Sequence, residues 1–308
     1  MANSLCDELR LLYQPKSEEV EALNSSYIVN CILNVLLSLT AIILNGVTIQ
    51  ALRRTSSLPK PLKTLLLSLA VSDLGVGFLC QPFYVVLLVK WLQRNSESTC
   101  TLYTVFVSAM GMFSVPTFFG IMALSVDRFL AIHLHLRYQE LVTHKRVVAA
   151  VISIWAFSVL FSLARLWIPK DFFSVMFIVI ALVCLLTTAL LYYKIYLAVR
   201  RHREQIEALQ VQQGTQNDET ANVSGLRKSA VGTFYVYLVF LICYLPQTCR
   251  FIAVVVSGSS TFTKGLTYYC WTLIFLNSSL NPVIYCWKMR HIRHAILDIL
   301  RNVLPSHS

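Results

Sequence analysis

Charged residues are what this sequence has least of. Only 13% of its 308 residues are charged, whereas 56% are hydrophobic and the mean hydropathy is +0.63. Soluble domains carry about 25% charged residues. The few charges lie in short clusters separated by long runs without any charge. This distribution argues against one or two soluble domains and indicates a chain whose solvent is lipid.

Metal-binding and targeting patterns are also missing. No CxxC pair and no Cys/His spacing typical of a metal site occurs, and most of the nine cysteines lie inside apolar runs. Residues 1–21 are rich in acidic side chains and contain no apolar segment of the signal-peptide kind. We therefore expect no metal site of Cys or His, and we expect the first apolar run to act as its own insertion signal.

Long apolar runs are what the sequence does have. Runs without charge occupy 22–52, 98–126, 147–164, 172–193, 229–249 and 265–287, and a further run at 64–89 is interrupted only by Asp73. A helix needs roughly 20 apolar residues to cross a bilayer, and backbone groups in lipid must be paired within the segment. The pattern predicts an all-α protein with seven spans at about 27–52, 62–89, 99–133, 145–167, 172–200, 226–257 and 263–287.

Basic residues predict the orientation of these spans. Most of the 26 lysines and arginines follow spans 1, 3, 5 and 7, as in Arg53-Arg54, Arg200-Arg201 and Lys288. Loops rich in basic residues stay in the cytoplasm. Residues 1–26, with the sequon at Asn24, are then extracellular, and residues 288–308 are cytoplasmic, in a multi-pass protein of the plasma membrane. Topology and contact with anionic lipids explain the net charge of +11 without nucleic acid.

Polar side chains inside the spans are functional candidates, because they are costly in lipid. Asp73 is the only acid deep in a span, and the other strongly polar groups are Asn45, Asn277, Ser278, Ser279 and Asn281. Such oxygen atoms suit a small hard cation, but they would equally form a hydrogen-bonded network between helices. The sequence leaves both interpretations open.

Two further features are weak when taken separately. Asp127-Arg128 ends the third span, where an ordinary interfacial charge pair would also be found. Prolines 116, 246 and 282 interrupt the third, sixth and seventh spans and would kink them.

Together, the motifs in successive spans resemble one family. In chain order they are Asn45; Leu69-Ala70-Val71-Ser72-Asp73; Ser125-Val126-Asp127-Arg128-Phe129-Leu130-Ala131-Ile132; Trp155; Tyr192-Tyr193-Lys194; Cys243-Tyr244-Leu245-Pro246; and Asn281-Pro282-Val283-Ile284-Tyr285. One motif stands in each span, over nearly the whole chain. The sequence is similar to the rhodopsin-like (class A) G-protein-coupled receptors, and the resemblance implies a seven-helix bundle with a short amphipathic eighth helix.

The resemblance implies roles for individual residues. In the family, an extracellular ligand signals to a heterotrimeric G protein through helix rearrangement. The implied activation switch comprises Asp127, Arg128, Tyr192, Phe240, Tyr244, Pro246, Asn281, Pro282 and Tyr285. The implied allosteric sodium site comprises Asp73, Thr117, Asn277 and Asn281. Arg128 and Leu136 would contact the G protein, and Lys288–Arg301 would lie on the inner leaflet with Ile292, Ala295, Ile296 and Ile299 on its apolar side.

The chain departs from the family in two places. The second external loop has no cysteine, and Tyr103 takes the place of the family's cysteine at the top of span 3, so the family's disulfide is absent. Cys6 could instead pair with Cys100 or Cys270. Cys184 stands where span 5 usually has proline. These departures resemble the melanocortin branch and its adenosine, cannabinoid and lysophospholipid neighbours.

The matching ligand pocket lies among the outer halves of the spans. It comprises Phe83, Tyr84, Met110, Gly111, Ser114, Gln247, Phe251, Trp271 and Phe275. Amine receptors need an acid at Met110, so a peptide or a small lipid is favoured over an amine. Arg165 and Arg250 could attract a carboxylate or phosphate, although snorkelling to the outer headgroups is favoured for Arg165.

Other classes of membrane protein fit the sequence less well. A transporter of a small solute is the chief alternative, but it would favour several charged residues at mid-membrane and paired broken helices. A retinal protein would need a lysine within span 7, which has none between Lys264 and Lys288. No histidine lies in a span interior and no catalytic constellation is visible, so we do not expect an enzyme.

Overall fold

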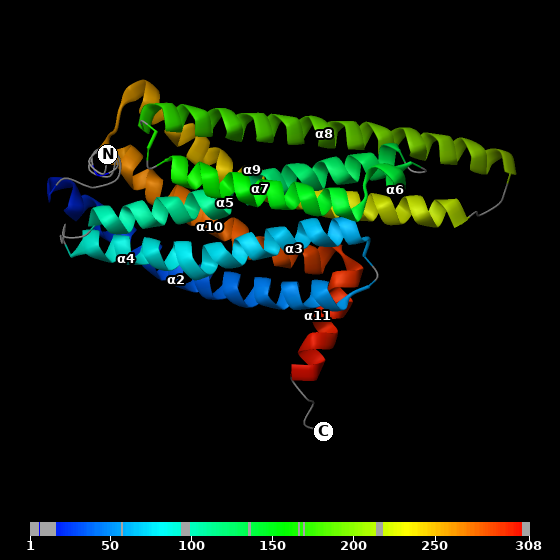
Figure 1. The fold of residues 1–308 in the computed structure, drawn as a ribbon, viewed down its shortest axis with the longest axis horizontal. Coiled ribbons are helices and arrows are strands. Elements are labelled where there is room, and N and C mark those ends of the chain that lie inside the picture. The colour runs from blue at the N-terminus through cyan, green and yellow to red at the C-terminus, as the bar shows by residue number, and fades with distance from the viewer. Residues whose placement is uncertain are drawn as a thin grey trace.

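The chain folds as a bundle of long helices. The computed structural model describes Cys6 and residues 17–56, 58–93, 99–134, 137–165, 167–168, 170–213 and 218–303, and no strand occurs among them. The helices are α2 (Ser17–Arg54), α3 (Lys60–Gly75), η2 (Val76–Cys80), α4 (Gln81–Leu92), α5 (Thr99–His133), α6 (Tyr138–Leu141), α7 (His144–Ala164), α8 (Lys170–Gln213), α9 (Asp218–Ser257), α10 (Thr261–Lys288) and α11 (Arg290–Val303). With α3, η2 and α4 forming one span, this order confirms the predicted seven-helix bundle and the short eighth helix (Figure 1).

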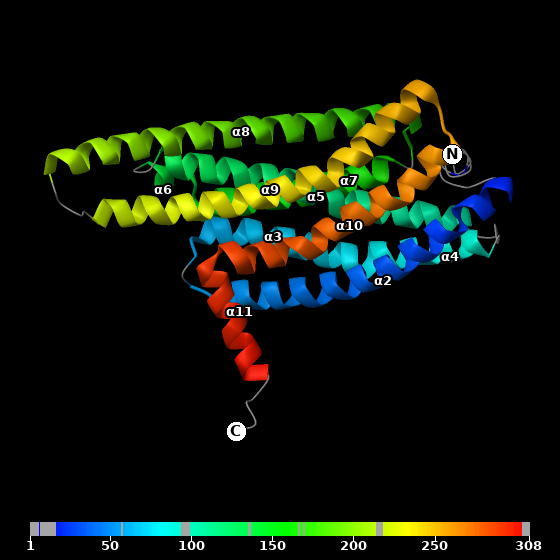
Figure 2. The ribbon, with the colours of Figure 1, turned by 180° about the vertical axis from the view of Figure 1, so that it is seen from behind.

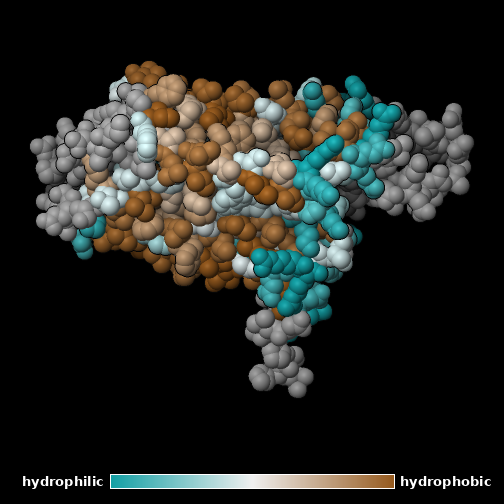
Figure 3. Space-filling view, viewed as in Figure 1, coloured by the Kyte–Doolittle hydropathy of each residue, from teal (hydrophilic) through white to brown (hydrophobic). Residues whose placement is uncertain are grey.

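The outside of the bundle is apolar because lipid surrounds it. Large hydrophobic side chains such as Ile32, Leu160 and Leu186 are exposed. Figure 3 shows hydrophobic residues over the middle of the visible face and hydrophilic ones gathered near the end from which α11 leaves. Six of the described spans are long and apolar enough to cross a membrane: α2, α3 with α4, α5, α7, α8 and α9.

The span α10 is not among these six because it carries much of the polar interior. Asn277, Ser278, Ser279 and Asn281 are all buried in it. Buried polar groups in lipid need partners, so the polar side of α10 faces other helices, whereas side chains such as Val283 and Trp287 on its other side are exposed. It packs against α2 and α9.

A polar seam joins α2 to α10. The Asn34 amide donates to Thr272 Oγ1 at 2.7 Å, and the Thr272 hydroxyl donates to Asn30 Oδ1 at 2.6 Å. Nearer the N-terminus of α2, the hydroxyls of Tyr27 and Tyr268 are 3.0 Å apart. Asn45 of this span was predicted as a polar group, whereas the residues of this seam were not. Helical spacing of Tyr27, Asn30 and Asn34 is the signal that could have found it.

The second span contains a π-helical turn that the sequence did not predict. The turn η2 lies just before Pro82, which has no N–H to donate to the carbonyl one turn earlier. The hydroxyl of Ser38 donates to the carbonyl oxygen of Gly77 at 2.8 Å. This side-chain hydrogen bond supplies a partner at the irregular turn and ties the second span to the first.

Several helices are longer than the predicted spans. Helix α8 continues beyond residue 200 to Gln213, and α9 begins at Asp218 rather than near 226. Apolarity marks only the part of a helix that lies in lipid, so it misses a polar extension. Figures 1 and 2 show α8 and α9 projecting together at the end of the bundle opposite the N-terminus.

The eighth helix is amphipathic as predicted. Ile292 and Ile299 of α11 are buried and Ile296 is half-buried, whereas Arg290 and His291 are exposed. Helical spacing places the isoleucines on one side. In Figure 1, α11 runs across the direction of the bundle helices.

A disulfide joins Cys6 to Cys100, with 5.3 Å between their Cα atoms. It links the N-terminal segment to the first turn of α5. This confirms one of the two pairings that the sequence left open, and Cys270 is a buried free thiol. The family's usual bridge to the second external loop is replaced by a bridge to the N-terminus.

Candidate functional site

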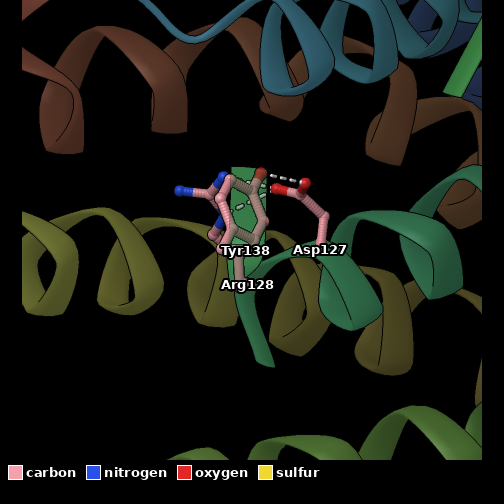
Figure 4. A network of polar contacts seen from close by, with 3 residues as sticks. All are labelled: Asp127, Arg128 and Tyr138. Atoms are coloured by element: carbon pink, nitrogen blue, oxygen red, sulfur yellow. Dashed lines mark hydrogen bonds and ion pairs between the residues drawn. The ribbon is translucent and has the colours of Figure 1, made fainter. Parts of the chain in front are cut away.

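A buried ion pair lies near the C-terminal end of α5. Arg128 is 4% exposed, and its Nε donates to Asp127 Oδ2 at 2.9 Å while a second guanidinium nitrogen contacts the same oxygen. The Tyr138 hydroxyl donates to Asp127 Oδ1 at 2.6 Å. Figure 4 shows the guanidinium and the phenol both directed at the Asp127 carboxylate. Asp127 therefore forms an ion pair with Arg128 and accepts a hydrogen bond from Tyr138.

Tyr138 is a residue of this site that the sequence analysis missed. It begins α6, the short helix that follows α5. Burial and the neighbouring Asp127 carboxylate raise the pKa of the Tyr138 hydroxyl above its usual value. The phenol therefore stays protonated and acts as the donor. A hydrogen bond to a carboxylate is about twice as strong as a neutral one, so Tyr138 helps to fix the position of Asp127.

Two buried tyrosines of the implied switch are Tyr192, in the middle of α8, and Tyr285, near the C-terminal end of α10. The hydroxyls of Tyr192 and Tyr285 have no hydrogen-bond partner among the described groups. Buried hydroxyls without a partner are rare and costly.

Three aromatic rings pack against one another between α5 and α9. The ring of Phe118 lies 4.9 Å from that of Phe240 and 4.7 Å from that of Tyr244, and the last two rings are 4.5 Å apart. Pro246 lies within α9 one half-turn farther out, and Figure 2 shows the outer part of α9 turning away from the line of its inner part. Phe118 was not predicted, because one more phenylalanine in an apolar span gives no signal.

Asp73 is fully buried at mid-membrane, at the meeting of the second and seventh spans. Its Oδ2 accepts a hydrogen bond of 2.8 Å from the Asn281 amide. The structure thus brings together two members of the implied sodium site. The hydroxyl of Thr117 donates to the Phe113 carbonyl at 3.2 Å and leaves its oxygen able to accept or to ligate.

The site around Asp73 contains oxygen atoms that could bind a cation. Asp73 Oδ1, Asn277 Oδ1 and Asn281 Oδ1 are buried without a hydrogen-bond partner among the described groups. One carboxylate and neutral amide oxygens are ligands for a hard cation. No group of three His, Cys, Asp or Glu side chains that could hold a metal occurs in the described ranges. These oxygen ligands suit a small monovalent ion better than a transition metal.

A cavity of about 70 Å³ lies among α5, α7, α8, α9 and α10. Six of the predicted pocket residues line it: Met110, Gly111, Ser114, Gln247, Phe251 and Trp271. The wall also includes Phe118 and Tyr244, so the cavity rests directly on the aromatic rings that lead inward. Arg165, for which snorkelling was favoured, lines this cavity.

The other three predicted pocket residues do not line this cavity. Tyr84 and Phe275 are buried, with ring centroids 5.3 Å apart, and Phe275 packs on Trp271. Tyr84 lines a second cavity of about 10 Å³. Phe83 is half-buried and lines neither of these two. Leu136, predicted as a G-protein contact, lies outside the described residues.

Comparison with known proteins agrees with this geometry. The family described as "7 transmembrane receptor (rhodopsin family)" matches residues 44–171 and 165–285. Melanocortin receptor 5 of Ovis aries is 28% identical, over 86% of this chain and 82% of the relative. Adenosine receptor A2b of Gallus gallus is 24% identical, over 92% and 91%. Histamine H2 receptor of Canis lupus familiaris is 25% identical, over 79% and 71%. This chain belongs to the rhodopsin family of seven-transmembrane receptors and is a G-protein-coupled receptor.

Proposed function

We propose that this receptor binds its ligand in the cavity between the outer halves of the spans and activates a heterotrimeric G protein by freeing Arg128 from Asp127. The observation that carries the proposal is the buried Arg128, restrained by Asp127 and Tyr138 at the inner end of α5. Ligand contact would reach this end through Phe118, Phe240 and Tyr244. Arg128, with Leu136, would then contact the G protein.

The proposed orientation places the N-terminus outside and the C-terminus in the cytoplasm of a cell whose plasma membrane holds the receptor. The bias of basic residues towards one end of the bundle supports it. The Cys6–Cys100 disulfide supports it as well, since disulfides persist in oxidising compartments. Helix α11 would then lie on the anionic inner leaflet, with its isoleucines towards the membrane.

A peptide or a small lipid is the proposed class of ligand, rather than an amine. An amine would need a carboxylate, and no Asp or Glu is among the described residues that line the cavity. One relative is named for histamine, an amine, and others for melanocortin and adenosine. The lack of an acidic side chain among the described lining residues favours a ligand that carries no positive charge.

Replacement of Tyr138 by phenylalanine tests the coupling without a known ligand. The variant loses the hydrogen bond from the phenol to Asp127 and should raise basal nucleotide exchange several-fold, because charged hydrogen bonds contribute about 1.5–3 kcal/mol. Exchange is measured on purified G-protein heterotrimers of each main family, with receptor in lipid nanodiscs.

Tyr269→Phe is the matched control. Its hydroxyl donates to Ser26 at the other end of the bundle, so its loss should leave basal exchange unchanged. Basal exchange in Tyr138→Phe equal to that of the unmodified receptor, with every heterotrimer, would contradict the proposed restraint.

An allosteric sodium ion is proposed at Asp73, with Thr117, Asn277 and Asn281. The unpaired buried oxygens support it. Sodium would stabilise the restrained state, so the unmodified receptor should melt at higher temperature in sodium chloride than in N-methylglucamine chloride of equal concentration. Asp73→Asn removes the charge and should abolish this difference. A difference that persists in Asp73→Asn would exclude Asp73 as the ligand.

A further inference from the structure

Arg165 lines the cavity and Arg250 contacts two of its lining residues, and the proposed function uses neither arginine. Arg250 is in α9, within the outer half of a membrane span, and is only 1% exposed. An arginine that snorkels reaches water or headgroups, and this one does not. A charged side chain buried within a span is expensive, and such residues are usually functional. The buried side chain of Arg250 is therefore expected to have a function in the interior of the bundle.

The side chain of Arg250 is fixed against the wall of the cavity. Its Nε donates to Gln247 Oε1 at 3.1 Å, and its guanidinium carbon lies 4.5 Å from the centre of the Phe251 ring. Gln247 and Phe251 both line the cavity. The positive charge of Arg250 thus lies directly behind this wall. Gln247 and Phe251 hold it there.

Arg165 supplies a second positive charge from a different helix. It caps the C-terminal end of α7 and lines the same cavity. The remaining described lining residues are aromatic, aliphatic or carry hydroxyl and amide groups, such as Ser114 and Thr248, and none is acidic. The positive charges of Arg165 at the lining and of Arg250 behind it favour an anion in the cavity over a cation.

The size of the cavity limits what the arginines can recognise. A volume of about 70 Å³ has room for roughly five water-sized groups, which is enough for a head group but not for a folded peptide. Guanidinium groups bind carboxylate and phosphate oxygens in matching geometry. The aromatic residues, among them Phe118, Phe177 and Trp271, provide an apolar surface for the part of the ligand next to its head.

We infer that the ligand of this receptor is an amphiphile with one anionic head group, a carboxylate or a phosphate, which binds in the cavity beside Arg165 and Arg250. The inference rests on the proposed function for the place of the ligand. It narrows the class from a peptide or lipid to a small anionic lipid or organic acid.

Thermal unfolding of the receptor in neutral phosphatidylcholine nanodiscs tests this inference. The probes are two matched pairs: oleate with oleyl alcohol, and oleoyl lysophosphatidate with monooleoylglycerol. A charged probe at a hundredfold excess over its dissociation constant should raise the melting temperature by about 5 °C, and its uncharged partner should not. The pair that responds distinguishes a carboxylate from a phosphate.

Variants connect the effect to the two arginines. In Arg165→Gln the apparent affinity for the charged probe should fall about 10- to 100-fold, as for the loss of a charged hydrogen bond. In Arg250→Gln it should fall less, because Arg250 lies behind the cavity wall and acts on the head group through its charge alone. Arg250→Lys keeps the positive charge and should retain part of the affinity for the charged probe. Arg54→Gln, an exposed arginine at the end of α2, is the control and should behave like the unmodified receptor. Each shift is referred to the same variant without probe, so a less stable variant still gives an answer.

Equal effects of the charged and uncharged members of both pairs, including no effect of either, would overturn the inference. So would a shift that is unchanged in both glutamine variants. Melting temperature reports binding and not G-protein activation. A receptor that is stabilised by the anion but fails to promote exchange would therefore contradict the proposed coupling and leave the anion site intact.

Discussion

Replacing Arg128 with alanine should reduce nucleotide exchange on G proteins to less than about a tenth of that of the unmodified receptor, while surface expression stays the same. The guanidinium is the group that a freed switch would present to Tyr192, Tyr285 and the G protein, and charged hydrogen bonds contribute about 1.5–3 kcal/mol each. Folding should tolerate the change because Asp127 keeps its hydrogen bond from Tyr138. Exchange is measured in membranes, and receptor number by surface labelling.

The control for this substitution is Arg137→Ala. Arg137 follows α5 closely but is exposed, and its loss should change exchange little. Undiminished exchange in Arg128→Ala would exclude the assigned role. A fall in surface receptor that matches the fall in exchange would show instead that Arg128 acts through folding.

Alanine at Gly75 should destabilise the receptor strongly. A Cβ atom there would lie 2.2 Å from Cε1 of Phe113, and the Phe113 ring has little room to move because it packs edge-on against Trp155, with 6.1 Å between the ring centres. Overpacking of this kind costs about 1–3 kcal/mol. We expect a lower melting temperature and fewer receptors at the cell surface.

Two variants separate this steric effect from a general effect of alanine. Gly46 also lies in a span, but nothing would approach its Cβ within 4 Å. Since alanine favours helix over glycine by about 1 kcal/mol, Gly46→Ala should be neutral or slightly stabilising. Adding Phe113→Leu to Gly75→Ala should recover part of the lost stability. If Gly75→Ala melts at the same temperature as the unmodified receptor, the close contact does not constrain the second span.

Some residues of the switch could be predicted from sequence motifs, and others could be found only in the structure. Asp127, Arg128 and Tyr285 could be named from the sequence because each lies in a short motif in a fixed span. Tyr138 could not, since its role depends on the short helix α6 bringing its phenol back to Asp127. Phe118 could not be predicted either, because only its packing distinguishes it from the other phenylalanines of α5.

The sequence by itself determined the number of spans, their helical state and the amphipathic eighth helix. These depend on local composition, because in lipid each segment must be apolar and must pair its own backbone groups. Only the tertiary structure decided which cysteine pairs with Cys6, where the π-helical turn lies, and that Arg165 lines a cavity whose wall Arg250 contacts. These features depend on contacts between segments far apart in the chain, which no local pattern records.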